Sequence, residues 1–183
     1  MNDRYSPPLA GELTEDQRRV ADAITGGLRG EIPGPLAMWL LRPELADRAQ
    51  RLGEYARYQT CLPTPLSEIA ILAVARHWCS EFEWHAHKQL ALDAGVSPAA
   101  IESIRTHQVP DWETPEQATV HEFSRTLLES QTVSDDVFER AITALGQEGV
   151  VDLVGILGYY SLISMTINVF DVPLPAGATS ELT

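Results

Sequence analysis

The stretch LSEIAILAVARHWCSEFEWHAHK, residues 66–88, joins a nearly continuous apolar run to a cluster of charged and aromatic side chains. The first part, as far as Ala75, is apolar almost all round, which predicts a helix that is buried on most sides. Ser80 and Glu83 have the S-x-x-E spacing of a capping box, so we expect a second helix to begin at Ser80. These two helices place Glu68 inside a buried run and the charged cluster directly after it.

A helical wheel divides the cluster in the second helix, residues 80–95, into two faces. At about 100° per residue, Glu83 and His87 fall on the arc that carries the apolar side chains. The opposite arc holds Glu81, His85, Lys88 and Gln89, and we expect it to face solvent. Burial of a charge is costly unless the charge is paired. Glu83 and His87 therefore have either a structural role, as a helix cap and a hydrogen-bonded core histidine, or a functional one.

The histidines do not predict a metal site. His85 and His87 lie about 200° apart on a helix, so they cannot bind one ion together. A three-ligand site of Glu68, Glu83 and His87 is chemically conceivable, because two carboxylates and an imidazole can hold a divalent metal. The sequence has no other cluster of ligands. We expect neither a metal nor another cofactor.

Helix-start signals recur along the chain and predict an all-α protein. Thr14 and Gln17 form a capping-box pattern that opens a helix ending near Gly26. Residues 43–59 predict a further helix, after a loop and a short helix in residues 29–43. Three more starts place a hydroxyl before a proline at the first helical position. These are Thr64-Pro65, Ser97-Pro98 and Thr114-Pro115.

The length of 183 residues predicts a single domain. We expect a helical bundle of about seven or eight helices over residues 14–172, preceded by a flexible N-terminus, residues 1–13, and followed by a tail, residues 173–183. Ser134 opens the last helical region. A break at residues 146–149 then precedes a long apolar helix.

The negative charge of the chain argues against nucleic acid and membranes as partners. The formal net charge of −13 repels phosphate backbones and anionic lipid, so we expect no nucleic acid and no membrane as a partner. The apolar segment of residues 150–170 is long enough to cross a bilayer. It contains Asp152 and Asn168, and no lysine or arginine flanks it. A helix buried in the core or in a subunit interface is the better interpretation.

Cysteine usage and the N-terminal sequence favour a cytoplasmic protein. Cys61 and Cys79 do not form a CxxC motif. Residues 1–13 show no basic segment followed by an apolar one, as a secretory leader would. We therefore expect reduced thiols and a cytoplasmic location.

Several segments resemble the carboxymuconolactone decarboxylase family, which includes the alkylhydroperoxidase D-like proteins. They are the run from Glu68 to Ala75, FEWHAH (residues 82–87) and LALDAGVS (residues 90–97), and the similarity extends to RGEIPGPL, LLRPELADRAQRLGEYARY and GVVDLVGILGYYSLISMTINVFDVPLP. The sequence is most similar to the thiol-free branch, whose motif has a glutamate followed by aromatic-Glu-Trp-x-x-His. The resemblance implies an alkylhydroperoxidase D-like helical bundle, and protomers that assemble as homo-trimers or homo-hexamers.

The peroxidase-type members of the family use a glutamate, a CxxC pair and a histidine. Carried over by position, Glu68 matches the glutamate and His87 the histidine, while Ser80 and Glu83 occupy the two cysteine positions. Cys79 lies one residue from the first cysteine position and has no partner at the right spacing. A dithiol cycle requires an attacking and a resolving thiol, so a peroxidase activity is not expected from this motif.

The resemblance implies a cofactor-independent lyase or isomerase with carboxymuconolactone decarboxylase-like chemistry. Glu68, Glu83 and His87 are the expected catalytic residues, with His87 as the group that titrates near neutral pH. The substrate would be a small lactone or an enolisable carbonyl or carboxylate compound. Five side chains are candidates for substrate binding, with Arg76 as a bidentate partner of a carboxylate. They are Trp39, Arg76, Ser80, Trp84 and Tyr159.

Two alternatives of other classes remain open. One is an alkylhydroperoxidase-like antioxidant or redox enzyme that uses Cys79 alone. The other is a non-catalytic oligomeric binding module that keeps only the fold.

Overall fold

The computed structural model describes residues 4–182, and every regular element in this range is a helix. The helices are η1 (Ala10–Glu12), α1 (Glu15–Thr25), α2 (Gly34–Trp39), α3 (Pro43–Tyr58), α4 (Thr64–His77), α5 (Glu81–Asp93), α6 (Pro98–Arg105), α7 (Pro115–Ser130) and α8 (Asp135–Phe170). The predicted all-α bundle is confirmed. The predicted division at residues 13 and 172 stays a prediction, and residues 1–3 and 183 of its two end segments lie outside the described range.

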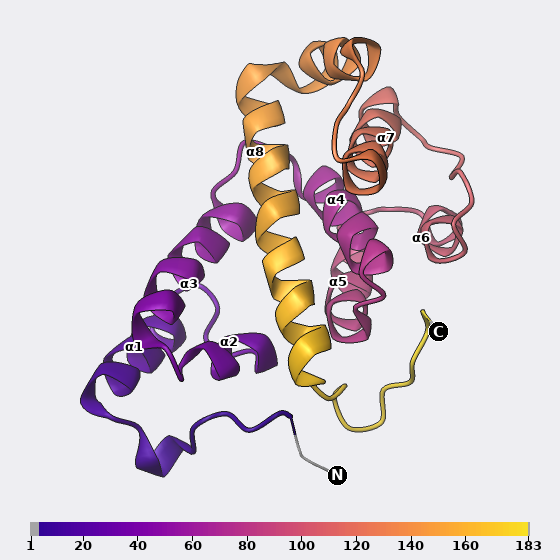
Figure 1. The fold of residues 1–183 in the computed structure, drawn as a ribbon. Helices are drawn as coiled ribbons and strands as arrows, with labels where there is room; N and C mark the ends of the chain where they lie inside the picture. The colour runs from indigo at the N-terminus through magenta and orange to yellow at the C-terminus, as the bar shows by residue number, and fades with distance from the viewer. Residues whose placement is uncertain (1–3, 183) are drawn as a thin grey trace.

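Helix α8 runs through the middle of the molecule, with α1, α2 and α3 on one side and α4 to α7 on the other (Figure 1). Its apolar side chains supply a large part of the core. The helix is long and apolar enough to cross a membrane, but 61% of its most apolar 18-residue window is buried inside the molecule. This burial is typical of the core helix that the sequence predicts.

Two features of α8 follow from single residues. Gly146 has φ +72°, a conformation that favours glycine, and it interrupts the helix at the predicted break. Asp152 is buried and accepts hydrogen bonds from the Tyr55 hydroxyl (2.6 Å) and the Cys61 backbone N–H (2.7 Å). The carboxylate thereby fastens α8 to α3 and to the loop before α4.

Helix α4 is buried over all of residues 66–75, as the continuous apolar run predicts. It packs against α5, α7 and α8. Its start differs from the prediction by one residue, because the extended backbone of Pro63 places Thr64 inside the first turn. Thr64 therefore does not cap the helix with its side chain. The predicted caps Thr14, Ser97 and Thr114 do accept the expected backbone hydrogen bonds.

The segment after α8 returns to the start of α5. The Glu81 carboxylate accepts hydrogen bonds from the backbone N–H groups of Glu181 (2.9 Å) and Leu182 (2.8 Å) and from the Ser180 hydroxyl. Lys88, also on α5, forms an ion pair with Glu181 (2.6 Å). Leu182 is buried. The outer face of α5, expected to face solvent, thus holds the C-terminal segment in place.

Candidate active site

The three expected catalytic side chains meet between α4 and α5. His87 Nδ1 lies 2.7 Å from Glu68 Oε2, and His87 Nε2 lies 3.1 Å from Glu83 Oε1. All three side chains are buried, with 3% to 6% of their surface exposed. The i, i+4 spacing on α5 aligns Glu83 with His87, and the packing of α4 on α5 brings in Glu68.

The two carboxylates keep His87 protonated. Burial lowers the pKa of His87, but the hydrogen bonds and negative charges of Glu68 and Glu83 outweigh it and raise the pKa from 6.5 to about 9. At neutral pH the imidazolium donates one N–H to each carboxylate. A proton shared among three buried groups is available for transfer to a bound molecule.

Helix capping does not explain Glu83. Ser80 is the N-cap residue of α5, but its hydroxyl makes no capping hydrogen bond and is a buried group without a partner among the described residues. The Glu83 carboxylate is bound to His87 instead. The structure therefore contradicts the predicted capping box, because the side chain that would complete it points into the core.

A small cavity of about 50 Å³ opens beside Glu83 and His87. Its wall comes from α2, α3, α5, α8 and the loop between α1 and α2. The lining residues are Arg29, Pro33, Pro35, Leu36, Arg57, Phe82, Glu83, Ala86, His87, Tyr159, Tyr160 and Ile163. The predicted loop and short helix in residues 29–43 thus cover the site. Glu68 lies at the far side of His87, where it lines a separate surface groove with Ser67 and other residues.

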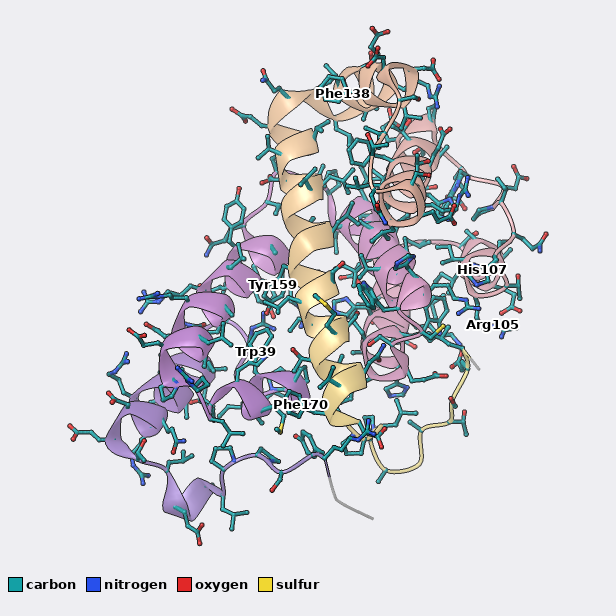
Figure 2. All side chains as sticks on the ribbon, in the orientation of Figure 1. Trp39, Arg105, His107, Phe138, Tyr159 and Phe170 are labelled. Carbon is teal, nitrogen blue, oxygen red and sulfur yellow. The ribbon has the colours of Figure 1, made fainter. Side chains whose placement is uncertain are left out.

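Aromatic rings form one wall of the cavity. The Tyr160 ring packs edge-on against the His87 ring, with 5.0 Å between centroids, and the Tyr159 ring lies 5.3 Å from that of Tyr160. Burial raises the pKa of Tyr159 to about 12, although Arg29 opposes the shift, so its hydroxyl stays protonated. Trp39 does not line the cavity, but it packs against Tyr159 and donates to Thr166 (2.9 Å) (Figure 2).

Arg76 and Trp84 lie away from this cavity. The Arg76 guanidinium is held by the Arg105 carbonyl (2.7 Å from Nε) and by the Cys79 sulfur (3.2 Å from Nη1). Trp84 is buried on another face of α5 and donates to Glu181 (3.4 Å). Arg76 follows the last buried turn of α4, which directs its side chain toward α6 and away from α8. The carboxylate-binding role predicted for Arg76 therefore has no geometric basis at this cavity.

Arg29 and Arg57 line the cavity and were not among the predicted site residues. Arg29 donates to the Tyr159 hydroxyl (3.3 Å) across 130 residues of sequence. A contact between residues this far apart in the sequence cannot be predicted from a local sequence pattern. One signal was present in the sequence, since Gly53 interrupts the predicted helix of residues 43–59 at a cost of roughly 0.5–1 kcal/mol. In the structure, a Cβ at Gly53 would lie 2.0 Å from the Tyr159 hydroxyl oxygen.

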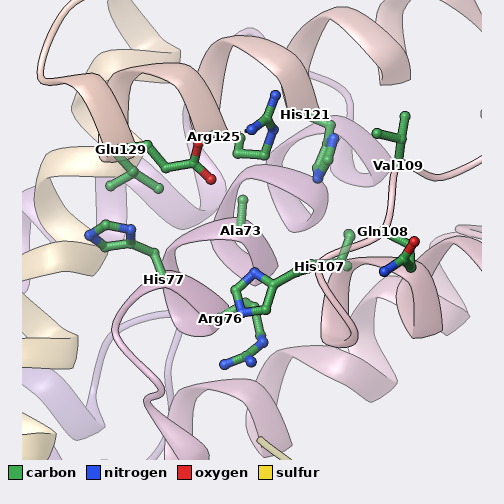
Figure 3. A pocket seen from close by; sticks show the side chains of 11 residues that line it. Ala73, Arg76, His77, His107, Gln108, Val109, His121, Arg125 and Glu129 are labelled. Atoms are coloured by element: carbon green, nitrogen blue, oxygen red, sulfur yellow. Dashed lines mark hydrogen bonds and ion pairs between the residues drawn. The ribbon is translucent and has the colours of Figure 1, made fainter.

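A second pocket of about 180 Å³ lies on the other side of α4, between α6 and α7. Its lining includes Arg76, His77, His107, His121 and Arg125 (Figure 3). Burial lowers the pKa of His121 to about 4, so this histidine is neutral. Within residues 4–182, no group of three or more histidine, cysteine, aspartate or glutamate side chains is arranged to hold a metal ion. At Glu68, Glu83 and His87, both ring nitrogens already contact carboxylates.

Comparison with known proteins relates part of the chain to one family. The model of the carboxymuconolactone decarboxylase family matches residues 43–122, a range that contains Glu68, Glu83 and His87. The match spans 80 of the 183 residues, which is less than half of the chain. The curated proteins offer no match to the sequence.

Two solved structures share the fold of this chain. The debrominase Bmp8 without ligand superposes with a TM-score of 0.75 at 15% identity, covering 96% of this chain and 94% of the Bmp8 chain. A cysteine-to-alanine variant of Bmp8 in complex with 2,3,4-tribromopyrrole superposes with a TM-score of 0.71 at 15% identity and the same coverage. At this identity the likeness extends to the fold alone.

Cys79, the cysteine next to Ser80 in the sequence, does not line the cavity. It is exposed and has φ +48°. Ser80 and Glu83, at the positions where peroxidase-type relatives would have cysteines, are a buried hydroxyl and a carboxylate bound to His87. The geometry at His87 is therefore suited to proton transfer without a thiol.

Proposed function

We propose that this protein is a cofactor-independent lyase or isomerase that moves a proton on a small lactone or enolisable carbonyl or carboxylate compound. The observation that carries the proposal is the buried His87 imidazolium, which is hydrogen-bonded on both sides while Glu83 and His87 face a cavity. The match of residues 43–122 to the carboxymuconolactone decarboxylase family model supports carbon-acid chemistry of this kind.

The proposed reaction uses Glu83 and His87 as one proton-carrying unit. In an isomerisation, the Glu83 carboxylate takes a proton from a substrate carbon while the His87 imidazolium stays paired with Glu83, and Glu83 returns the proton to a different carbon. In a decarboxylation, the C–C bond to the carboxylate breaks, carbon dioxide leaves, and the unit protonates the resulting enolate at carbon. Glu68 keeps the far side of the imidazolium paired throughout.

Tyr159 would stabilise the enolate oxygen. Tyr159 lines the cavity, and its hydroxyl accepts a hydrogen bond from Arg29, so the hydroxyl proton is available to a bound molecule. A pKa near 12 keeps this proton on the tyrosine at neutral pH. A hydrogen bond aimed at the developing negative charge lowers the barrier of enolisation.

The experiment that tests the proposal follows carboxymuconolactone and its decarboxylated enol-lactone in D₂O by NMR. The purified protein is expected to release carbon dioxide from the first or to exchange carbon-bound protons of the second. The His87→Ala variant should lose this activity, while the matched variant His85→Ala should keep it, because His85 is exposed on the same helix. Equal turnover by the two variants would overturn the proposal.

A redox role for Cys79 has less support, because the thiol is exposed and lies outside the cavity. If it acted alone as a peroxidase, the wild-type protein would consume a hydroperoxide and the Cys79→Ser variant would not. We expect the two proteins to behave alike. A difference between them would favour the redox enzyme.

The protomer is proposed to assemble as a homo-oligomer, a trimer or a hexamer. Its α8 helix exposes the apolar side chains of Val151, Val154, Met165 and Val169 along its length. Such side chains on a central helix are suited to burial against another copy. Light scattering on the purified protein should give a mass of three or six times 20.2 kDa. A monomeric mass at micromolar concentration would contradict this.

A further inference from the structure

Arg29 and Arg57 are the basic residues of the cavity beside His87. Neither forms an ion pair with a carboxylate within residues 4–182. Arg48 and Arg51 on the same helix as Arg57 behave differently, since each pairs with an acidic residue four positions earlier. In a chain with a net charge of −13, acidic partners are abundant. Within residues 4–182, Arg18, Arg42 and Arg76 also lack an ion pair, but only Arg29 and Arg57 place such guanidinium groups together at this cavity.

One hydrogen-bond donor of the Arg29 side chain has no acceptor. Its Nη2 donates to the Tyr159 hydroxyl (3.3 Å), while its Nε–H is buried and has no hydrogen-bond partner in the described part of the chain. A buried donor without an acceptor is unfavourable, and a native fold usually supplies one. A ligand oxygen in the adjoining cavity would satisfy this N–H.

Gly53 makes the approach of Arg29 to the site feasible. A Cβ at this position would lie 2.5 Å from Arg29 Nη2 as well as 2.0 Å from the Tyr159 hydroxyl oxygen. Any other residue at position 53 would displace both groups. The absence of a side chain thus makes room for the arginine and the tyrosine together, next to the turn that carries Arg57.

We propose that Arg29 and Arg57 bind the carboxylate of a small substrate and hold its reacting carbon against Glu83 and His87. Guanidinium groups bind carboxylates through paired, charge-assisted hydrogen bonds. The negative field of the whole protein repels anions, so a local pair of cations is needed to admit one. The cavity of about 50 Å³ accommodates a group of only a few heavy atoms, which is the size of a carboxylate and the carbon that bears it.

This inference rests on the proposed function for the role of His87, but it assigns a binding site in its own right. Arg29 lies outside residues 43–122, the part of the chain that the family model matches. The specificity of this site is therefore built partly by a segment that precedes the family-matched residues, the loop between α1 and α2.

The test measures binding and requires no turnover. Pyruvate and its neutral analogue pyruvamide are titrated into the ¹⁵N-labelled protein, and the arginine Nε–H signals are followed by NMR. Pyruvate should bind at least about tenfold more tightly than pyruvamide and shift the Arg29 Nε–H signal, because a carboxylate accepts charge-assisted hydrogen bonds. Acetate and benzoate extend the panel, and inorganic phosphate tests another anion.

Variants of single arginines show whether the preference for pyruvate depends on this cavity. The Arg29→Gln and Arg57→Gln variants should each lose the preference for pyruvate, and Arg29→Lys should recover only part of it, because lysine keeps the charge without the paired donors. Arg48→Gln removes the same charge from an exposed position of α3 and should leave the preference within about twofold. Circular dichroism verifies that each variant is folded.

Several outcomes would overturn the inference. They are an equal affinity for pyruvate and pyruvamide, an unchanged preference in both glutamine variants, tighter binding of phosphate than of every carboxylate, or no shift with any carboxylate at millimolar concentration. The failure of the proposed function gives a different pattern. In that case carboxylates bind through Arg29 and Arg57, but neither decarboxylation nor proton exchange is detected.

Discussion

The two faces of α5 carry the same kinds of residue at the same spacing, yet they do different things. On the inner face, Glu83 and His87 are buried, and together with Glu68 they hold a proton. On the outer face, Glu81 and His85 repeat the Glu-x-x-x-His pattern, but His85 is exposed and Glu81 binds the backbone of the C-terminal segment. The comparison teaches that burial, and the partner brought by a neighbouring helix, turn an ordinary helical pair into a chemical group.

The strongest test of this comparison exchanges the two histidines for alanine. His87→Ala should lower the rate of proton transfer by about 10²–10⁴-fold, the usual contribution of a positioned acid or base. His85→Ala should leave the rate unchanged, because this ring is exposed. Both rates are measured with the same substrate under the same conditions. A large loss in the His85 variant would show that the two faces are not separate.

The pH dependence of stability is the next largest effect. The pKa of His87 is raised on folding from 6.5 to about 9, so the protonated ring stabilises the fold below about pH 6.5 and this contribution is lost as the pH rises through 9. A shift of this size corresponds to roughly 3 kcal/mol. Urea unfolding of the wild type across this range should show the loss.

The matched variants isolate this effect from other titrations. His87→Gln should lose less stability than the wild type between these pH values, while His85→Gln should follow the wild type. An NMR titration of His87 gives its pKa directly. A value near 6.5 would contradict the paired imidazolium.

The two glutamates of α5 should separate activity from stability. Glu83→Gln is expected to lower the pKa of His87 and to reduce proton transfer by about 10²-fold, since a carboxylate that pairs with the ring is lost. Glu81→Gln should lower the free energy of unfolding by about 1–2 kcal/mol, because an amide is a weaker acceptor for the backbone N–H groups of residues 181 and 182. Its activity should stay within about twofold of the wild type. An inactive but stable Glu81 variant would reverse the assignment of the two faces.

The smallest effect is expected at Lys88. Its ion pair with Glu181 is about one-third exposed and screened by water and salt, so Lys88→Met should cost less than about 1 kcal/mol of stability. The difference from the wild type should shrink further at high salt. Thermal unfolding at low and high ionic strength measures both. A cost that is large and independent of salt would show that this pair is part of a buried network.

Much of the fold was predictable because its signals are local. The apolar run of residues 66–75, the capping box at Thr14 and the proline-marked starts of α6 and α7 depend only on residues within a few positions of one another. Even the separation of Glu83 from Glu81 followed from helix geometry alone. Ser80 is the exception. Its spacing to Glu83 predicts a capping box, but Glu83 pairs with the buried His87 ring instead, and this pairing depends on how α5 packs in the fold.

The substrate side of the site was less predictable. Arg76 has the right chemistry to hold a carboxylate, but its position on α4 places it at the Arg105 carbonyl. Arg29 and Arg57 have the same chemistry and lie at the cavity, because a loop and a helix from the first third of the chain fold against α8. The choice among twelve arginines depends on contacts between residues far apart in the sequence.

The sequence by itself determined which helices form, which face of α5 is apolar, and that a glutamate and a histidine lie one turn apart on it. These properties arise from the 3.6-residue period and from the chemistry of single side chains. Only the tertiary structure decided that Glu68 reaches the other side of the His87 ring, that Arg29 meets Tyr159 over Gly53, and that the C-terminal segment occupies the outer face. Such contacts depend on the packing of whole helices, where burial changes the energy of a charge and where the absence of one Cβ admits a distant side chain.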